Sequence, residues 1–254
     1  MAKTTKSAKS DRQAVIQKMR KQQRGAERAR GFAIVGVCLA VSLVIIGAAA
    51  YKPVKGWWDG RDLKTVAVAD IGAPAAEVCD DITTQKADGN QNHVPTGTPV
   101  EYTTSPPAFG AHWNESGIAP APFERKLYTV DDRPELESLV HNLEHGYSLL
   151  WFDETAAKDD AMMDDIKAIA EKYDTSDNNM RDKFIAVPWT KADGDPFPDG
   201  KHIALTHWSI GGVGATDTSN QLGAFQYCSA PSGEAVADFM KKYPYFDSPE
   251  PNGM

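Results

Sequence analysis

The short string H-N-L-E-H at residues 141–145 contains the residue types of a metal site. His141 and His145 are four positions apart, so a helix would place them one turn apart on the same face. Glu144 lies beside them, and neutral imidazole nitrogens and carboxylate oxygens both bind zinc and related ions. This spacing makes His141, Glu144 and His145 candidate metal ligands.

A closed metal site also needs a donor from another part of the chain. His112 is the first candidate for that donor, and His207 is the second. The ion would be divalent, either zinc or copper. The competing interpretation is a buried polar network without an ion, since a histidine near a helix C-terminus also interacts favourably with the helix dipole. His93 lies in a loop rich in glycine and asparagine, where we expect it to be exposed.

The same string matches the H-x-x-E-H pattern of the inverted zinc peptidases, in which the histidines hold zinc and the glutamate activates water. One alternative is therefore a metal-dependent hydrolase of the cell envelope, with Glu144 as base and Glu171 as a further ligand. Gly146 ends the predicted helix at once, however, whereas those peptidases need a much larger clamshell. A metal delivery protein is another alternative. The chain has no Ser-His-Asp spacing and no phosphate-binding glycine loop, so we assign no catalytic residue.

A second cluster of unusual composition occupies residues 102–113, which read Y-T-T-S-P-P-A-F-G-A-H-W. Prolines restrict the backbone, and aromatic side chains supply large contact areas, so this loop is suited to packing against a protein surface. We expect the partner contacts to come from its prolines and aromatic residues, namely Tyr102, Pro106, Pro107, Phe109 and Trp113.

The candidate residues must be positioned by a domain with alternating elements. We expect helices at 131–145, 155–173 and 232–243, and strands at 126–130, 147–152, 184–189 and 202–208. This order predicts an α+β fold in which a small mixed sheet is flanked by helices, and it parallels the order of the thioredoxin-like topology.

Charge and hydropathy divide the chain before this domain. Residues 1–31 carry ten basic and two acidic side chains, and residues 32–51 carry none. Twenty apolar residues match the length of a helix that crosses a bilayer, so we predict a transmembrane helix at 32–51 in contact with membrane lipid. The alternative is a signal peptide cleaved near Ala48–Ala50. The positive-inside rule places the basic segment in the cytoplasm, an irregular membrane-proximal stalk and arm at 52–99 outside, and the domain at 100–254 outside as well.

The extracytoplasmic part is acidic, because residues 52–254 hold 17 of the 27 basic and 33 of the 35 acidic side chains. Such a balance argues against a nucleic-acid partner, which requires a basic face. Setting aside Cys38 in the predicted span, Cys79 and Cys228 form an even pair on the oxidising side of the membrane, which indicates a disulfide. Two separate buried thiols are the alternative. Neither cysteine belongs to a C-x-x-C pair, so redox catalysis is not indicated.

The predicted anchor, the 102–113 loop and the string V-H-N-L-E-H-G-Y at 140–147 together resemble an actinobacterial family of membrane-anchored proteins classed as a domain of unknown function. The overall layout is also similar to that of an accessory subunit of the corynebacterial cytochrome bcc-aa3 respiratory supercomplex. This resemblance implies a non-catalytic accessory or assembly subunit. Its partners would be cytochrome bcc and aa3 oxidase subunits, and the domain would brace them on the outer face of the membrane.

Overall fold

The computed structural model describes residues 41–42, 44, 46, 65–175 and 179–253. The predicted basic segment, most of the predicted span and Cys38 lie outside these ranges. Among the described residues, no helix has the length and apolar character that crossing a membrane requires. The chain divides into two compact units, Met1–Arg61 and Asp62–Met254, and the account below concerns the second.

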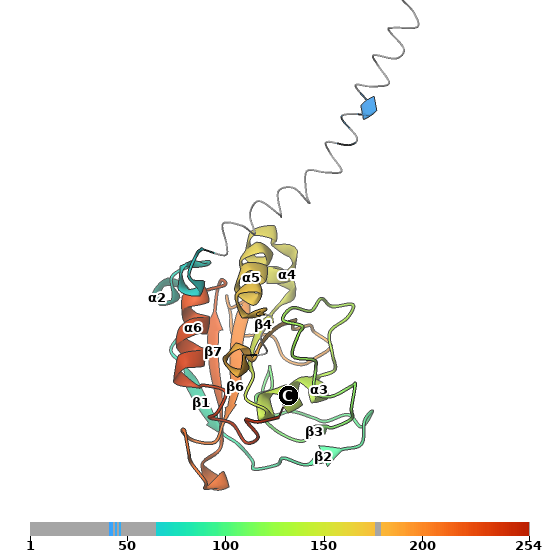
Figure 1. Ribbon diagram of the computed structural model, residues 1–254, viewed down its shortest axis with the longest axis vertical. Helices are drawn as coiled ribbons and strands as arrows, with labels where there is room; N and C mark the ends of the chain where they lie inside the picture. The colour runs from blue at the N-terminus through green and yellow to red at the C-terminus, as the bar shows by residue number, and fades with distance from the viewer. Residues whose placement is uncertain (1–40, 43, 45, 47–64, 176–178, 254) are drawn as a thin grey trace, which may run out of the picture. The chain divides into compact units, whose positions relative to one another are not determined.

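A five-stranded sheet forms the centre of this unit, with the order β1-β7-β6-β4-β5 (Figure 1). β4 and β5 are parallel, and every other neighbouring pair is antiparallel. The strands are β1 (Thr83–Lys86), β4 (Ser148–Phe152), β5 (Phe184–Pro188), β6 (Ile203–Ser209) and β7 (Leu222–Cys228). The prediction of a mixed sheet flanked by helices in an α+β fold is confirmed.

The two faces of the sheet carry separate hydrophobic clusters, because successive side chains of a strand point to opposite faces. Along β4, Leu149 and Trp151 join one cluster, whereas Leu150 and Phe152 join the other. Helix α3 (Leu136–Glu144) packs into the first cluster, and α5 (Asp160–Tyr173) and α6 (Gly233–Lys242) pack into the second. The shorter helices are η1 (Val68–Asp70), α2 (Ala75–Val78), α4 (Glu154–Lys158), η2 (Met180–Asp182) and η3 (Thr218–Asn220).

The helices differ in detail from the prediction. The helix expected at 155–173 is two helices, α4 and α5, because Asp153 and Asp159 each cap a new helix through their side-chain oxygens. Helix α3 starts only at Leu136, five residues later than expected, and Pro134 precedes it. The strand expected at 126–130 is reduced to a single bridge between Leu127 and Ala186.

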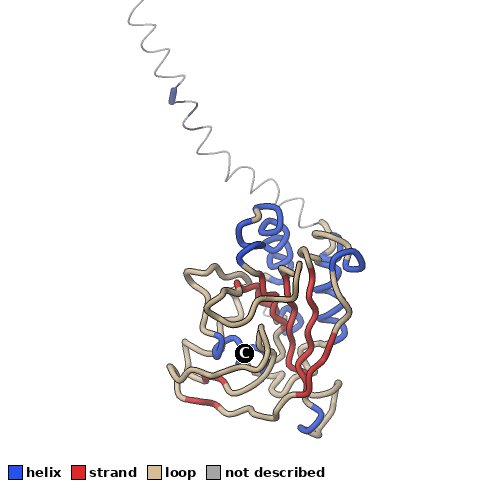
Figure 2. Tube along the Cα trace, turned by 180° about the vertical axis from the view of Figure 1, so that it is seen from behind, coloured by secondary structure: helices blue, strands red, loops and turns tan. Residues whose placement is uncertain are grey.

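Residues 65–99, which lie before the predicted start of the domain at residue 100, fall in the same compact unit as the sheet. β1 pairs with β7, and β2 (His93–Val94) pairs in parallel with β3 (His112–Trp113). Figure 2 shows the β2-β3 pair in a loop-rich region apart from the main sheet. The predicted disulfide between Cys79 and Cys228 is present and fastens this segment to the end of β7.

Removal of the disulfide tests how firmly the segment is held. The bond joins residues 149 positions apart, and closing so long a loop stabilises the fold by about 5 kcal/mol in the chain-entropy model. We expect the Cys79→Ser/Cys228→Ser variant to lose about 2–5 kcal/mol of unfolding free energy, measured by urea denaturation. A reducing agent should destabilise the native chain but leave the variant unchanged. Equal unfolding midpoints for the two oxidised proteins would contradict this expectation.

Candidate metal centre

Helix α3 presents two buried stripes to the domain. Leu139 and Leu143 are fully buried in the hydrophobic cluster, while His141 and Glu144 are each only 1% exposed on the adjacent stripe. His145 caps the helix, and Gly146 follows with φ of +88°. A side chain at Gly146 would collide with the carbonyl oxygen of Tyr245, so glycine is required both for the turn and for the approach of the C-terminal segment.

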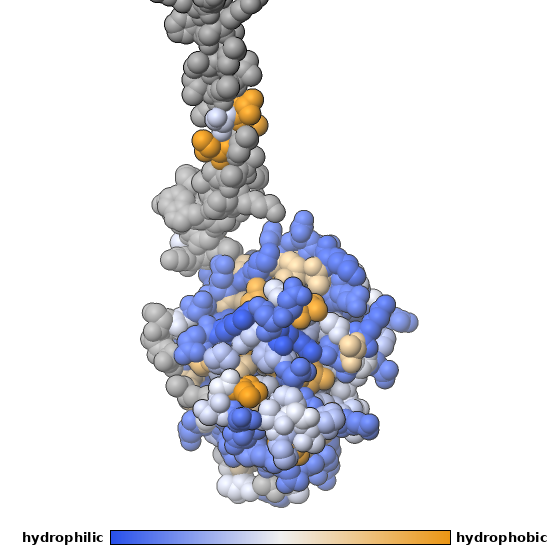
Figure 3. Space-filling view, turned by 90° about the vertical axis from the view of Figure 1, so that its right-hand side faces the viewer, coloured by the Kyte–Doolittle hydropathy of each residue, from blue (hydrophilic) through white to orange (hydrophobic). Residues whose placement is uncertain are grey.

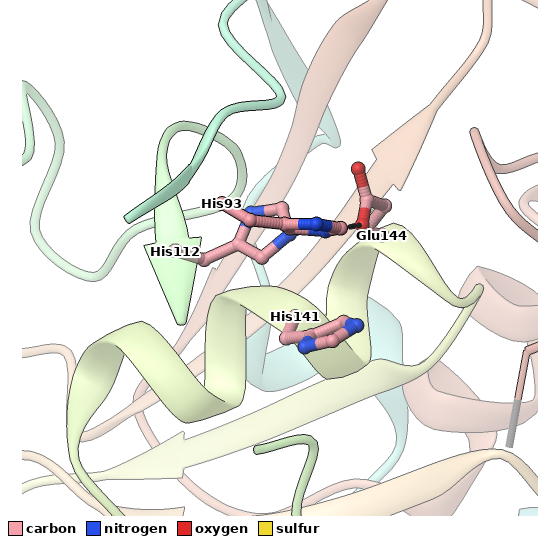
Figure 4. A group of neighbouring side chains, drawn as sticks. All are labelled: His93, His112, His141 and Glu144. Carbon is pink, nitrogen blue, oxygen red and sulfur yellow. Dashed lines mark hydrogen bonds and ion pairs between the residues drawn. The ribbon is translucent and has the colours of Figure 1, made fainter. Parts of the chain in front are cut away.

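Four side chains converge beside this helix. The ligand atoms of His93, His112, His141 and Glu144 all lie within 4.8 Å of one another. Nε2 of His112 is 2.9 Å from Oε2 of Glu144, and Nε2 of His93 is 3.5 Å from the same oxygen. Figure 4 shows these side chains gathered over α3, with His112 coming from β3 and His93 from the segment before it. In a tetrahedral zinc site with Zn–N of about 2.0 Å, ligand atoms are about 3.3 Å apart, so small side-chain rotations would close this group around an ion.

Backbone carbonyl groups determine which ring nitrogens can bind an ion. Nδ1 of His112 donates to the carbonyl oxygen of Gly110 at 2.9 Å, and Nδ1 of His141 donates to that of Trp113 at 2.6 Å. Because each Nδ1 carries the donated proton, each neutral ring keeps its lone pair on Nε2. A hydrogen bond from the second nitrogen to a backbone carbonyl group is the arrangement that orients metal-binding histidines.

Glu144 is held by a chain of amide side chains. Gln91 donates to Oε1 of Glu144 at 3.1 Å, Gln221 donates to Gln91 at 3.1 Å, and Trp208 donates to Gln221 at 3.2 Å. Burial alone would raise the pKa of Glu144, but the hydrogen bonds from His112 and Gln91 hold that pKa below its usual value. Glu144 is therefore a fixed, buried carboxylate.

The histidines of α3 are neutral at physiological pH. Burial, followed by the neighbouring His145 and His112, lowers the pKa of His141 to about 4. Burial, followed by the ammonium group of Lys183, lowers the pKa of His145 to about 4. Metal ions bind only the neutral form of imidazole, so both rings are prepared for ligation.

A second group of possible metal ligands shares Glu144 with the first group. Ligand atoms of Glu144, His145 and Glu250 also lie within 4.8 Å of one another. Nε2 of His145 is 3.1 Å from Nε2 of His141 and 3.6 Å from Oε2 of Glu250, while its Nδ1 is buried without a hydrogen-bond partner.

The structure thus brings the predicted ligands His112, His141 and Glu144 together and places His145 next to them in the second group. His207 lies elsewhere, between the carbonyl oxygens of Tyr147 and Asp247. Sequence reasoning placed neither His93 nor Glu250 in the site. His93 is exposed as expected, with 40% of its side chain accessible, yet it still reaches Glu144. No periodic pattern in the flanking loop indicates that contact.

The 102–113 loop orients two of the candidate ligands. Of the residues predicted to contact a partner, Pro106, Pro107, Phe109 and Trp113 are buried within the domain, and Tyr102 is half-buried. Phe109 packs against Trp208 with ring centroids 6.3 Å apart. Gly223 of β7 lies against the loop, where a side chain would collide with Ala108 and Phe109. The loop carries the carbonyl group of residue 110, which orients His112, and that of residue 113, which orients His141. The loop therefore orients both histidines, and its contact with a partner stays a prediction.

The lowered pKa values of His141 and His145 predict a pH dependence for the metal-free protein. Their pKa is about 4 in the folded state and 6.5 ordinarily, so the unfolded state binds more protons between these values. The unfolding free energy of the chelator-treated protein should therefore fall as the pH is lowered from about 6.5 to 4. Urea titrations should give a shallower slope for His141→Gln. Val130→Ala, which changes an exposed residue and removes no titratable group, should keep the native slope. A native slope in His141→Gln would contradict this assignment.

Comparison with known proteins places this chain in a family. Residues 93–253 match the family model described as "Protein of unknown function (DUF3105)", a range that runs from His93 to the end of the C-terminal segment. Among curated proteins and among solved structures, no match was found. Because the matched range covers more than half of the chain and contains every residue of both His/Glu groups, the chain belongs to the DUF3105 family.

Proposed function

We propose that this domain binds a divalent transition-metal ion, zinc, through His93, His112, His141 and Glu144. The pair of backbone hydrogen bonds that leave the Nε2 lone pairs of His112 and His141 free carries the proposal. Nε2 of His112 lies 2.9 Å from Oε2 of Glu144, a contact that is favourable only with a proton or a metal ion between the two atoms. A zinc ion bound by both atoms would take the place of the proton.

The donor set favours zinc over other ions. Imidazole nitrogens suit zinc, copper, iron and nickel, while a site made only of oxygen atoms would suit magnesium or calcium. The set has no sulfur ligand, and Cys79 and Cys228 are joined to each other, so monovalent copper has no soft donor here. Four protein donors also match the closed tetrahedral shell that is typical of structural zinc.

The same geometry favours a structural ion over a hydrolytic one. A zinc hydrolase keeps one coordination position for water and a glutamate free to activate it. Glu144 is 1% exposed and is itself one of the converging donors. A groove of about 640 Å³ lies elsewhere, between residues 153–159 and 189–202. We therefore propose a non-catalytic role in which the ion ties β2 and β3 to α3.

A non-catalytic domain of this kind fits the accessory role in a cytochrome bcc-aa3 supercomplex, which remains a prediction from the resemblance. The face of the molecule in Figure 3 is mostly hydrophilic, with small separate hydrophobic spots. Contacts through such a face would be polar, in keeping with the acidic composition. The thioredoxin-like arrangement is likewise part of this proposal: β7-β6-β4-β5, with parallel β4 and β5 joined through α5, would form its core, without C-x-x-C chemistry.

Metal binding is tested with the purified, chelator-stripped full chain. Zinc at about 100 times its dissociation constant should stabilise the folded state by about 2.7 kcal/mol, because it binds the folded state only. The zinc-dependent rise in melting temperature should disappear in His112→Ala and His141→Ala. His202→Ala is the matched control and should keep the rise, since its ring contacts Asp153 outside the cluster. A native chain that retains no zinc, or an unchanged rise in His141→Ala, would refute the proposal.

The accessory role is tested by gentle purification of the C-terminally tagged chain from its own membranes. A subunit of a respiratory supercomplex should co-purify with haem proteins in near-stoichiometric yield, seen in reduced-minus-oxidised spectra and by mass spectrometry. The untagged strain serves as the control. A haem-free preparation would count against this role and leave the metal proposal untouched.

A further inference from the structure

His145 is the buried group that the proposed ion would leave without a partner. Its residue is 7% exposed, its Nδ1 has no hydrogen-bond partner, and its Nε2 is 3.1 Å from Nε2 of His141. His141 donates through Nδ1 to Trp113, so its Nε2 accepts. In the metal-free chain, His145 therefore satisfies one nitrogen by donating to His141.

Metal binding removes that acceptor. Once Nε2 of His141 coordinates the ion, its lone pair is occupied and His145 can no longer donate to it. Both nitrogens of His145 would then be buried without a partner, and buried polar groups left unsatisfied destabilise the folded state. Once the first ion is bound, His145 therefore needs a new hydrogen-bond or metal partner.

Two carboxylates already face His145. Oε2 of Glu250 is 3.6 Å from its Nε2, and Glu144 completes a group whose ligand atoms lie within 4.8 Å of one another. Glu144 has two oxygens, so one carboxylate can serve both groups. The side chain of Glu250 is 55% exposed, which leaves this position accessible from solvent.

The C-terminal segment is built to keep Glu250 in place. Its end lies beside α3 in Figures 1 and 2. Nζ of buried Lys183 donates to the carbonyl oxygens of His145, Pro251 and Gly253 at 2.6, 2.9 and 2.6 Å. The backbone nitrogen of Glu250 donates to the carbonyl oxygen of Glu144 at 2.9 Å. Gly253 packs against the imidazole of His145, where any side chain would collide with the ring. This end of the chain is therefore fixed around His145.

We propose that His145, Glu250 and Glu144 bind a second divalent ion of the zinc type, with Glu144 bridging the two positions. This inference rests on the proposed function, because filling the first position is what deprives His145 of its acceptor. Two carboxylates facing two divalent ions leave a net positive centre, and water on the exposed side completes the shell of the second ion.

Native mass spectrometry of the full chain after zinc reconstitution measures the number of ions directly. We expect two zinc ions per native chain and one in Glu250→Gln and His145→Gln, with the affinity of the remaining ion unchanged within about threefold. Glu171→Gln alters an exposed glutamate on α5 outside both groups and should keep both ions. Glu250→Gln keeps the backbone hydrogen bond to Glu144, so its circular dichroism spectrum should match the native one.

The outcomes separate the two proposals. One zinc ion in both the native chain and Glu250→Gln would overturn the second position and leave the first intact. One ion that is lost in His145→Gln but kept in His93→Gln would also overturn it, because His145 would then replace His93 at a single position. No zinc in the native chain would overturn both proposals.

Discussion

The contact between His112 and Glu144 is the constraint on which the rest of the site depends. A carboxylate that is 1% exposed is costly unless charge or hydrogen bonds compensate it. Here Oε2 lies 2.9 Å from an imidazole nitrogen of His112. Oε1 accepts a hydrogen bond from Gln91, which accepts one from Gln221, which in turn accepts one from Trp208. Helix α3, β3 and the start of β7 therefore have to meet at one place. The packing of the 102–113 loop follows from the same requirement, because its carbonyl groups set both histidine tautomers.

The segment between Cys79 and His93 shows how this site and the fold support each other. β1 is an edge strand whose residues are all exposed, so its own side chains add little burial to the sheet. A covalent bond holds the segment at one end, where Cys79 joins Cys228, and the His93–Glu144 contact holds it at the other. An ion bound by His93 and Glu144 would make the attachment at His93 as firm as the disulfide at Cys79. The edge strand would then be fastened on both sides, which also limits its availability for pairing with other chains.

Local signals in the sequence were sufficient for the elements that are buried on both faces. β4 and β5 are short, mostly apolar runs, and β6 begins with one; the spacing of His141 and His145 on a helix needed no tertiary information. β7 gave no such signal, because Gly223 and Gln226 interrupt its apolar pattern and its pairing with β6 and β1 determines its conformation. His93 and Glu250 could not be found for a related reason. His93 lies in the two-residue strand β2 and Glu250 in the C-terminal segment, and long-range contacts that leave no local pattern bring them to Glu144 and His145.

The surroundings of Glu144 and His145 support the proposed non-catalytic interpretation of the H-x-x-E-H string. In this fold Oε2 of Glu144 meets His112, and Gln91 donates to its second oxygen. The histidine that follows caps the helix and is covered by the C-terminal segment, and Lys183 joins the two by donating to the carbonyl groups of His145, Pro251 and Gly253. On the buried side, protein groups would fill the coordination positions of an ion bound here. Exposure is confined to His93 on one side and Glu250 on the other, so ions could enter and leave at these two residues while the buried donors between them stay fixed.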